Sequence, residues 1–276
     1  MIKAIITDLD GTLFHNHGKT AFDLTKRNEE SLERLKENNV NLFIATGRAP
    51  VFAHAILDKY GFSDHKIAAF NGSVMEDNDK RINTYLLNKE SIKEIYDFLL
   101  SDLDGIDCIQ LMSVEALRIF HDKTSKHVEP YRKAIEDLHL GSISDIEIKD
   151  YISSDIELEI PKVMINFRDP EITKVYFKKL LDTFNDKYFV AQSFDQYIEI
   201  CSLGTSKGKL VKYLVDEYGY KYDEISVIGD SSNDLGMYVE DVHKFSMQSG
   251  SSEELKEKAD YIVTDFAECV DISLSL

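Results

Sequence analysis

Residues 2–14 have the sequence IKAIITDLDGTLF, and the fold class that we predict for the rest of the chain follows from this stretch. An apolar, β-branched run comes first and then breaks at Asp8 and Asp10, two carboxylates one residue apart. Such a run, ended by Gly11, predicts a buried parallel strand with a loop at its carboxyl end. Ligands of open α/β sheets bind beyond that end of the strands. We therefore expect a ligand site at Asp8 and Asp10.

The two aspartates also indicate what such a site would hold. Residues two apart on a strand share a face, so the carboxylates of Asp8 and Asp10 converge if the extended geometry continues up to Gly11. Adjacent carboxylates repel, and each is costly to bury unpaired, so a divalent cation is their simplest partner. Oxygen donors favour Mg²⁺ over zinc or copper. The alternative is a solvated turn, since Asp and Gly are ordinary turn residues.

The next strand is expected at residues 41–45, NLFIA, and it ends in Thr46-Gly47-Arg48. Pro50 lies near the start of the helix that should follow. A hydroxyl and a glycine at the end of a strand can offer an oxygen ligand and backbone N–H groups to an anion, although this pair is also common punctuation after strands. Arg48 either faces a substrate or is solvated near the helix start.

Residues 67–70 predict a third strand, closed by Asn71-Gly72. Asn-Gly most often makes a tight hairpin turn. We expect this turn to border the ligand cavity as well, so that it serves both the fold and the site.

Further along the chain, residues 202–208 have the sequence SLGTSKG and precede a segment whose apolar residues have helical spacing. Lys207 would lie in the first turn of this helix, where a cation opposes the helix dipole by about 0.3–1 kcal/mol. That placement makes sense if an anion lies between Lys207 and the helix. The alternative is a lysine that faces solvent.

Residues 224–230 predict another buried strand that ends in a carboxylate, Asp230, and the sequence SSNDLGM follows it. Asn233 or Asp234, taken singly, could cap a helix. Capping does not explain the whole string at the end of a buried strand. We therefore expect these polar side chains to join the site.

Between these motifs the pattern changes at about residue 84. Apolar residues have helical spacing at 92–99 and 177–184 and alternate, as in a strand packed on one face, at 163–167. Short strands are expected at 107–111, 116–120 and 189–190, a helix at 125–138, and an exposed loop with one edge strand at 142–159. The chain therefore divides into a core at 1–83, an inserted α+β unit at 84–190, and the second part of the core at 191–276.

Two segments near the first strand complete the outline. A helix is expected at 25–38, with Leu32 and Leu35 on its inner face. The polar segment 15–19 contains His15 and His17. A solvated loop beside the site explains these histidines better than a metal centre does, because no third nitrogen or sulfur ligand stands nearby.

Composition excludes several classes of function. The chain has 276 residues and a formal net charge of −18, which opposes binding to nucleic acid or anionic membranes. A phosphate site would therefore need its own positive charge and metal. Cys108, Cys201 and Cys269 are far apart, so neither a disulfide framework nor a zinc site is expected. No long apolar run suggests a membrane span or a leader, and we expect a cytoplasmic protein.

Four of these segments resemble, in order, the motifs of the haloacid dehalogenase (HAD) superfamily, most of whose members are phosphohydrolases. They are DLDGTL from residue 8, TG from residue 46, SKG from residue 206 and GDSSNDLGM from residue 229. The insert resembles the C2-type cap of the Cof-like (type IIB) branch, which also has Asn-Gly at the place of Asn71-Gly72. Residues 247–250, MQSG, depart from the MGNA string that is usual there.

The resemblance implies a role for each residue. Asp8 would be the nucleophile and Asp10 the acid/base. Mg²⁺ would be held by Asp8, by Asp10 through its backbone C=O, and by Asp230, while Asp234 would orient the site or contact a metal-bound water. The residues expected to bind the phosphate or the substrate are Leu9, Thr46, Gly47, Arg48, Asn71, Gly72, Lys207 and Asn233.

The resemblance also implies an α/β fold, with a Rossmann-like core of parallel strands and an inserted α+β cap that acts as a mobile lid or, alternatively, as a rigid second domain. The expected activity is Mg²⁺-dependent hydrolysis of small phosphate monoesters, such as sugar phosphates, pyridoxal phosphate or FMN, through an aspartyl-phosphate. The alternatives are a phosphomutase and a catalytically silent binding protein. The expected partner is the phosphate ester, with no nucleic acid and no membrane, and either a monomer or a homodimer is consistent with the sequence.

Overall fold

A computed structural model of the chain describes residues 1–14, 24–78, 80–122, 124, 128–129, 132–133, 141–193, 195–239 and 241–276. The chain divides into two units, one formed by Met1–Asn83 with Ser206–Leu276 and the other by Thr84–Thr205. The predicted loop at 15–19, with His15 and His17, lies outside the described residues, as does most of the predicted helix at 125–138. Within the described residues, no helix is both long and apolar enough to cross a membrane.

The first unit is built on an eight-stranded sheet with the order β14-β13-β12-β1-β2-β3-β4-β5. The strands from β14 to β3 pair in parallel, whereas β4 is antiparallel to β3. Their bounds are β1 (Ala4–Thr7), β2 (Asn41–Ala45), β3 (Lys66–Ala69), β4 (Val74–Asp77), β5 (Lys80–Thr84), β12 (Ile225–Gly229), β13 (His243–Met247) and β14 (Tyr261–Val263). All residues of the central strands β1 and β12 are buried, as expected for strands covered on both faces.

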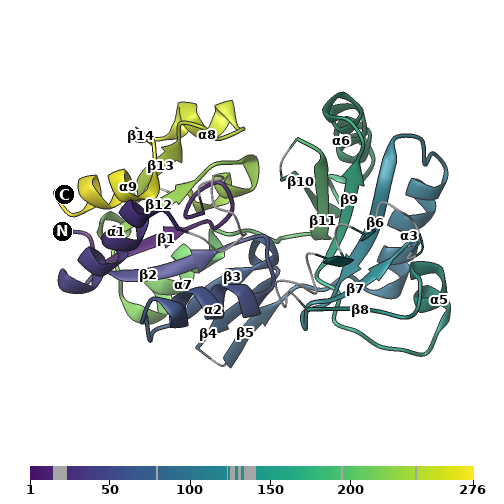
Figure 1. Cartoon of the computed structure of the whole chain (residues 1–276), viewed down its shortest axis with the longest axis horizontal. Helices are drawn as coiled ribbons and strands as arrows, with labels where there is room; N and C mark the ends of the chain where they lie inside the picture. The colour runs from purple at the N-terminus through teal and green to yellow at the C-terminus, as the bar shows by residue number, and fades with distance from the viewer. Residues whose placement is uncertain are drawn as a thin grey trace. The chain divides into compact units, whose positions relative to one another are not determined.

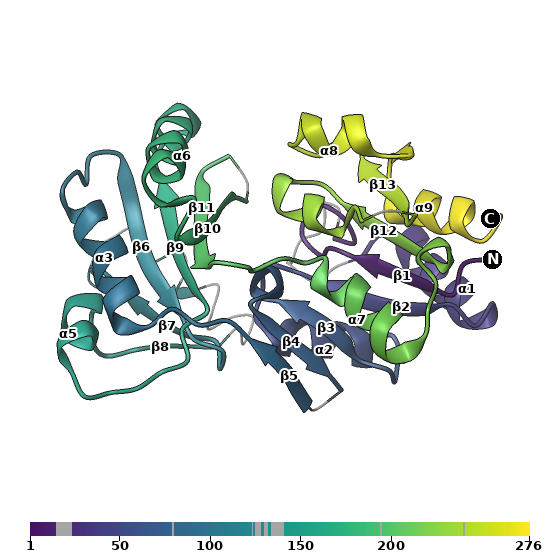
Figure 2. The same ribbon diagram turned by 180° about the vertical axis from the view of Figure 1, so that it is seen from behind.

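Helices cover both faces of this sheet. Figures 1 and 2 show α7 on one face and α1 and α2 on the other, and α9 packs against α1. Short 3₁₀ helices lie at Phe70–Gly72, Tyr222–Glu224 and Ser232–Met237. The α-helices are α1 (Lys26–Glu37), α2 (Pro50–Lys59), α7 (Lys209–Tyr218), α8 (Glu253–Lys258) and α9 (Phe266–Ser273).

The predicted helix at 25–38 is confirmed, and its ends have physical causes. Thr25 is the N-cap of α1, and its hydroxyl accepts a hydrogen bond from the N–H of Asn28. Leu32 and Leu35 are buried against the sheet side. Pro50 occupies the first position of α2, where its missing N–H costs nothing.

The second unit has a six-stranded sheet with the order β10-β11-β9-β6-β7-β8, antiparallel except for the parallel pair β7 and β8. Helices α3, α5 and α6 pack on one face of it around a single apolar cluster. The elements are α3 (Lys89–Leu100), β6 (Ile106–Met112), β7 (Leu117–Phe120), β8 (Ser142–Ile143), α5 (Ile148–Ser153), β9 (Lys162–Phe167), α6 (Pro170–Phe184), β10 (Tyr188–Gln192) and β11 (Tyr197–Ser202).

The structure confirms the predicted fold class, an α/β core with an inserted α+β unit, and corrects two details. The second boundary lies at Thr205 and not at residue 190, because β11 pairs with β9 and β10 and so belongs to the second sheet. The segment 142–159 has the expected edge strand, β8, but it also contains α5. Ile148 and Tyr151 of α5 are buried, so this part of the segment is not an exposed loop.

Candidate active site

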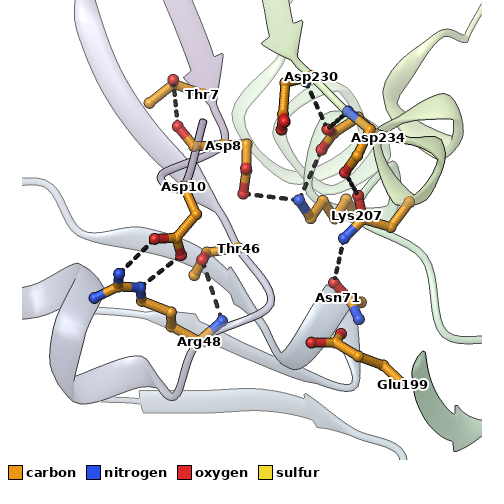
Figure 3. A network of polar contacts seen from close by, with 12 residues as sticks. Thr7, Asp8, Asp10, Thr46, Arg48, Asn71, Glu199, Lys207, Asp230 and Asp234 are labelled. Atoms are coloured by element: carbon orange, nitrogen blue, oxygen red, sulfur yellow. Dashed lines mark hydrogen bonds and ion pairs between the residues drawn. The ribbon is translucent and has the colours of Figure 1, made fainter. Parts of the chain in front are cut away.

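The carboxyl ends of two neighbouring parallel strands bring Asp8 and Asp230 together. Asp8 directly follows β1, Asp230 directly follows β12, and the N–H of Asp8 continues the ladder by donating to the carbonyl of Ile228 at 3.0 Å. Asp234 comes from the 3₁₀ helix just beyond β12. One carboxylate oxygen of each of these aspartates lies within 4.8 Å of the others. Figure 3 shows the three side chains gathered around the ammonium group of Lys207.

Two glycines make this close approach possible. Gly11 has a φ of +81°, and a Cβ on it would lie 2.5 Å from Oδ2 of Asp230. A Cβ on Gly229 would lie 2.3 Å from Cγ of Asp234. The glycine of the DLDG string is therefore required by the side chain of a residue more than two hundred positions away, which the sequence alone did not reveal.

Lys207 is completely buried and connects the aspartates. Its Nζ donates to Oδ1 of Asp8 at 2.8 Å and to Oδ1 of Asp234 at 2.7 Å. The expectation that Lys207 lies in the first turn of a helix is slightly wrong, because α7 begins at Lys209 with Gly208 as its N-cap. The groups beside its ammonium are carboxylates of the protein itself, so the alternative of a lysine that faces solvent is wrong, whereas the expected contact with a phosphate stays a prediction.

The charge of this cluster is unbalanced. Burial raises the pKa of Asp8 to about 7 against the opposing effect of Lys207, and the nearby Asp234 and Asp10 raise it further. Burial likewise raises the pKa of Asp230 to about 8, with Asp234 and Asp8 adding to the rise. Burial works to lower the pKa of Lys207, but Asp234 and Asp8 outweigh it and raise the pKa. One lysine thus faces three carboxylates that would gain from a second cation.

These residues fit a magnesium ion. The donors are all carboxylate oxygens, which are the ligands that Mg²⁺ prefers. Both carboxylate oxygens of Asp234 already accept hydrogen bonds. Its Oδ1 accepts from Lys207, and its Oδ2 accepts from the backbone N–H groups of Asp230 and Ser231 at 2.9 and 3.0 Å. By contrast, no group among the described residues donates a hydrogen bond to the carboxylate of Asp230. Asp8 and Asp230 are therefore the side chains best placed to hold the ion.

A second set of polar groups follows β2 and β3. The backbone N–H of Asn71 donates to the carbonyl of Thr46 at 2.8 Å, and Asn71 has a left-handed φ of 61° in the predicted hairpin turn. The amide of Asn233 donates to Oδ1 of Asn71 at 3.0 Å and accepts from the hydroxyl of Ser231 at 2.6 Å. Thr46, Asn71 and Asn233 are all buried. Ser231 was missed by sequence reasoning, although its position inside the GDSSND string was a signal.

Asp10 and Arg48 form an ion pair that the sequence did not predict. Nε of Arg48 donates to Oδ2 of Asp10 at 2.6 Å, and Nη2 donates to Oδ1. The carboxylate of Asp10 therefore does not converge with that of Asp8 on one cation, and it is not part of the acidic cluster around Lys207. Only its backbone C=O remains as the predicted metal ligand.

The remaining predicted residues are backbone positions. Leu9 is fully buried, and its carbonyl accepts from the N–H groups of Thr12 and Phe14, so its side chain belongs to the core. Gly47 joins Thr46 to Arg48 in the loop after β2. Gly72 has a φ of +91°, and a Cβ on it would lie 2.1 Å from the carbonyl oxygen of Ser206, next to Lys207. The turn after β3 thus supports the loop that carries the buried lysine.

Comparison with known proteins shows which family the chain belongs to. The chain matches the family model of haloacid dehalogenase-like hydrolases over residues 5–269. It is similar to a 5-amino-6-(5-phospho-D-ribitylamino)uracil phosphatase of Bacillus subtilis, at 29% identity over 95% of this chain and 92% of the relative. A phosphoglycolate phosphatase of Archaeoglobus fulgidus is 27% identical over 94% and 89%. The structure of a HAD/Cof-like hydrolase from Plasmodium vivax has the same fold, with a TM-score of 0.80 at 18% identity over 99% of this chain and 95% of that one.

Proposed function

The chain belongs to the haloacid dehalogenase-like hydrolases, in their Cof-like branch of phosphatases that act on small phosphorylated metabolites, and from this premise we propose that it hydrolyses phosphate monoesters through an aspartyl-phosphate on Asp8. The observation that carries the proposal is the buried cluster at the ends of β1 and β12. There a nucleophilic carboxylate lies 2.8 Å from the Nζ of Lys207 and within 4.8 Å of Asp230.

We assign the metal site to Asp8, Asp230 and the backbone C=O of Asp10. A bound Mg²⁺ would neutralise the charge that builds up between the carboxylate and the phosphate dianion. Asp234 acts on the site indirectly, because it holds Lys207 with one oxygen and the backbone after β12 with the other.

The side chains of this protein then divide the reaction between them. Asp8 attacks phosphorus and forms an acyl phosphate, while the P–O electron pair of the ester leaves with the alkoxide. Asp10 gives that oxygen a proton and later accepts one from the water that attacks the phosphoenzyme. Thr46, Lys207 and Asn233 bind the phosphoryl oxygens, whose negative charge must be stabilised in the transition state.

We propose that the substrate is a small phosphate ester. The relatives named above point to two compounds for a first test, a ribitylaminouracil phosphate and phosphoglycolate. Sugar phosphates, pyridoxal phosphate and FMN complete the panel.

Release of inorganic phosphate from this panel tests the proposal. We expect at least one ester to be hydrolysed with Mg²⁺ present, and hydrolysis to stop with EDTA and resume when Mg²⁺ is restored. Free phosphate separates hydrolysis from a mutase reaction, which returns the phosphoryl group to the substrate. Intact-mass spectrometry after acid quenching should find a phosphoryl adduct on the chain. A wild-type protein that releases phosphate from no ester, or that ignores EDTA, contradicts the proposal.

A further inference from the structure

The guanidinium group of Arg48 is fixed on Asp10 by two parallel hydrogen bonds. Nε and Nη2 donate to the two carboxylate oxygens, the fork-to-fork arrangement that Arg forms and Lys cannot. The pair is partly sheltered, since the side chains of Arg48 and Asp10 are 19% and 28% exposed. Figure 3 shows both hydrogen bonds, with the third nitrogen of the guanidinium turned away from Asp10.

The surroundings hold Arg48 in this orientation. Its guanidinium carbon lies 5.7 Å from the ring centre of Phe14 and 5.6 Å from that of Phe52, within the range of cation–π attraction. Phe14 and Phe52 are both buried, so neither ring is free to turn away at low cost.

The backbone of Arg48 is fixed as well. Its N–H donates to the hydroxyl of Thr46 at 3.1 Å, and its carbonyl accepts from the N–H of Phe70 at 3.0 Å. Both backbone groups of Arg48 are therefore hydrogen-bonded, which fixes the point from which its side chain reaches Asp10. A residue held in this way is suited to fixing another side chain.

We propose that Arg48 is a positioning residue for the acid/base Asp10, and not a ligand of the phosphate. This inference rests on the proposed function, because it requires Asp10 to exchange protons during ester hydrolysis. Arg48 holds the carboxylate in one orientation, aimed at the leaving oxygen and then at the attacking water. Each carboxylate oxygen has two lone pairs, so one on each oxygen stays available for a proton while Arg48 occupies the other.

The chemistry of the first step explains what the pair contributes. The O–H bond of protonated Asp10 breaks and a new O–H bond forms on the leaving oxygen, which has taken the electron pair of the broken P–O bond. The carboxylate of Asp10 that remains is negative, and the guanidinium of Arg48 is already in place to stabilise it, so no solvent reorganisation is needed. Misplacing a reacting group by about 1 Å can cost on the order of 10²-fold in rate, so holding its orientation matters.

Two esters distinguish this role from phosphate binding. Glycerol phosphate has a basic leaving group that needs a proton, whereas p-nitrophenolate leaves without one. We expect Arg48→Ala to lower kcat/KM for glycerol phosphate on the order of 10²-fold and for p-nitrophenyl phosphate by less than about tenfold. The ratio of the two values is unaffected if part of the variant fails to fold, because both esters are measured on the same preparation.

A double-mutant cycle tests whether Arg48 acts through Asp10. In an Asp10→Asn background, adding Arg48→Ala should change kcat/KM by less than about twofold, because the group it positions is no longer an acid. Arg48→Lys keeps the charge but loses the two-point contact, so it should show the same dependence on leaving group as Arg48→Ala. Arg34→Ala, which removes a surface ion pair with Asp271, is the matched control and should leave the ratio unchanged.

Three results would overturn the inference while leaving the proposed function intact. The first is a loss of kcat/KM in Arg48→Ala that is equal for both esters and comes with a raised KM. The second is that the effects of Arg48→Ala and Asp10→Asn on kcat/KM are fully additive. The third is that Arg48→Lys has the wild-type ratio of kcat/KM between the two esters. If glycerol phosphate is not hydrolysed, the alkyl phosphate that the wild type hydrolyses fastest takes its place in the ratio. A wild-type protein that releases phosphate from no ester contradicts the proposed function itself, and this inference with it.

Discussion

The parallel strands of the first unit's sheet have a buried lysine beside aspartates at each end, one at the amino ends of the strands and one at the carboxyl ends. We call these two ends the edges of the sheet, and they differ in how the aspartates are paired. At the amino end of β3, Lys66 is 2% exposed and pairs with Asp64, and its Nζ lies 3.7 Å from Oδ1 of Asp77. Asp77 also accepts hydrogen bonds from the hydroxyls of Tyr213 and Tyr218. At the carboxyl end of β1, Lys207 faces Asp8 and Asp234, with Asp230 close by.

The pKa values follow this difference. Burial works to raise the pKa of Asp77, but Tyr218, Tyr213 and Lys66 outweigh it and hold the pKa below its usual value. Burial raises the pKa of Asp8 to about 7, and Lys207 does not compensate for it. The protein's own side chains thus compensate the charge of Asp77 at the edge of Lys66, whereas the edge of Lys207 keeps a surplus of negative charge. Surplus buried charge that the fold does not neutralise is typical of a site that awaits a ligand.

The largest expected effect at the unsatisfied edge is on catalysis. Asp8→Asn removes the nucleophile and keeps the shape, so turnover of p-nitrophenyl phosphate should fall by at least about 10⁴-fold. The metal-free variant should be no less stable than the wild type above pH 7, because the substitution removes a charge that burial disfavours. Phosphate release and urea unfolding measure the two effects. Full activity in this variant would remove the assignment of Asp8.

Replacing each lysine tests the comparison directly. Lys207→Met leaves Asp8 and Asp234 buried without their cation and should cost about 3–5 kcal/mol of stability and at least about 10²-fold in kcat. Lys66→Met should cost about 1–3 kcal/mol with kcat unchanged, because Asp77 keeps its two tyrosine donors. Urea unfolding and steady-state kinetics on both variants would separate the edges. Equal losses of activity would refute the distinction.

The two edges should also respond oppositely to pH. In the folded, metal-free protein Asp8 and Asp230 bind protons more tightly than in the unfolded chain, so the free energy of unfolding should fall as pH rises from about 4 to 8. The lowered pKa of Asp77 gives stability that is present above pH 4 and lost in acid. Urea unfolding between pH 5 and 8 with EDTA should show the decline, and added Mg²⁺ should remove most of it. A decline that persists in Asp230→Asn at full size would contradict this origin.

A smaller effect is expected from two glycines of similar backbone shape. Gly11→Ala places a Cβ against the carboxylate of Asp230, whereas Gly105→Ala, in the second unit, meets the side chain of Ile172 at 2.7 Å. Both have φ near +80°, so each substitution should cost about 1–3 kcal/mol. Only Gly11→Ala should also weaken Mg²⁺ binding, as measured by titration calorimetry. Loss of binding in Gly105→Ala instead would show that the metal site depends on global stability.

Much of the fold could be predicted from sequence because its signals are local. The strand predicted at 41–45 is a short apolar run that ends at Thr46-Gly47, and the structure has it at the same residues. Helix α5 was missed because six residues within an acidic stretch are too few for a helical period to stand out, although Ile148, Tyr151 and Ile152 have the i, i+3, i+4 spacing. The second domain boundary was misplaced at residue 190 because the sequence of a strand such as β11 does not say which sheet it joins.

The site was predictable for residues that follow a strand and not for contacts between distant side chains. Asp8 and Asp230 were found because both end buried strands, and parallel neighbours bring such ends together. The ion pair between Asp10 and Arg48 has no sequence pattern, since it depends on the direction in which each side chain turns. The same holds for Lys66 and Tyr218, whose ammonium and ring are 4.0 Å apart.

We propose above all that Asp8 and Asp230, whose negative charge the fold does not neutralise, hold a divalent cation. Titration calorimetry of Mg²⁺ into the EDTA-treated and dialysed protein tests it most directly, with Asp230→Asn and Lys66→Met measured beside the wild type. We expect one ion per chain in the wild type and in Lys66→Met, and binding weakened by at least about tenfold in Asp230→Asn. Unchanged binding in Asp230→Asn, or no binding to the wild type, would contradict the account.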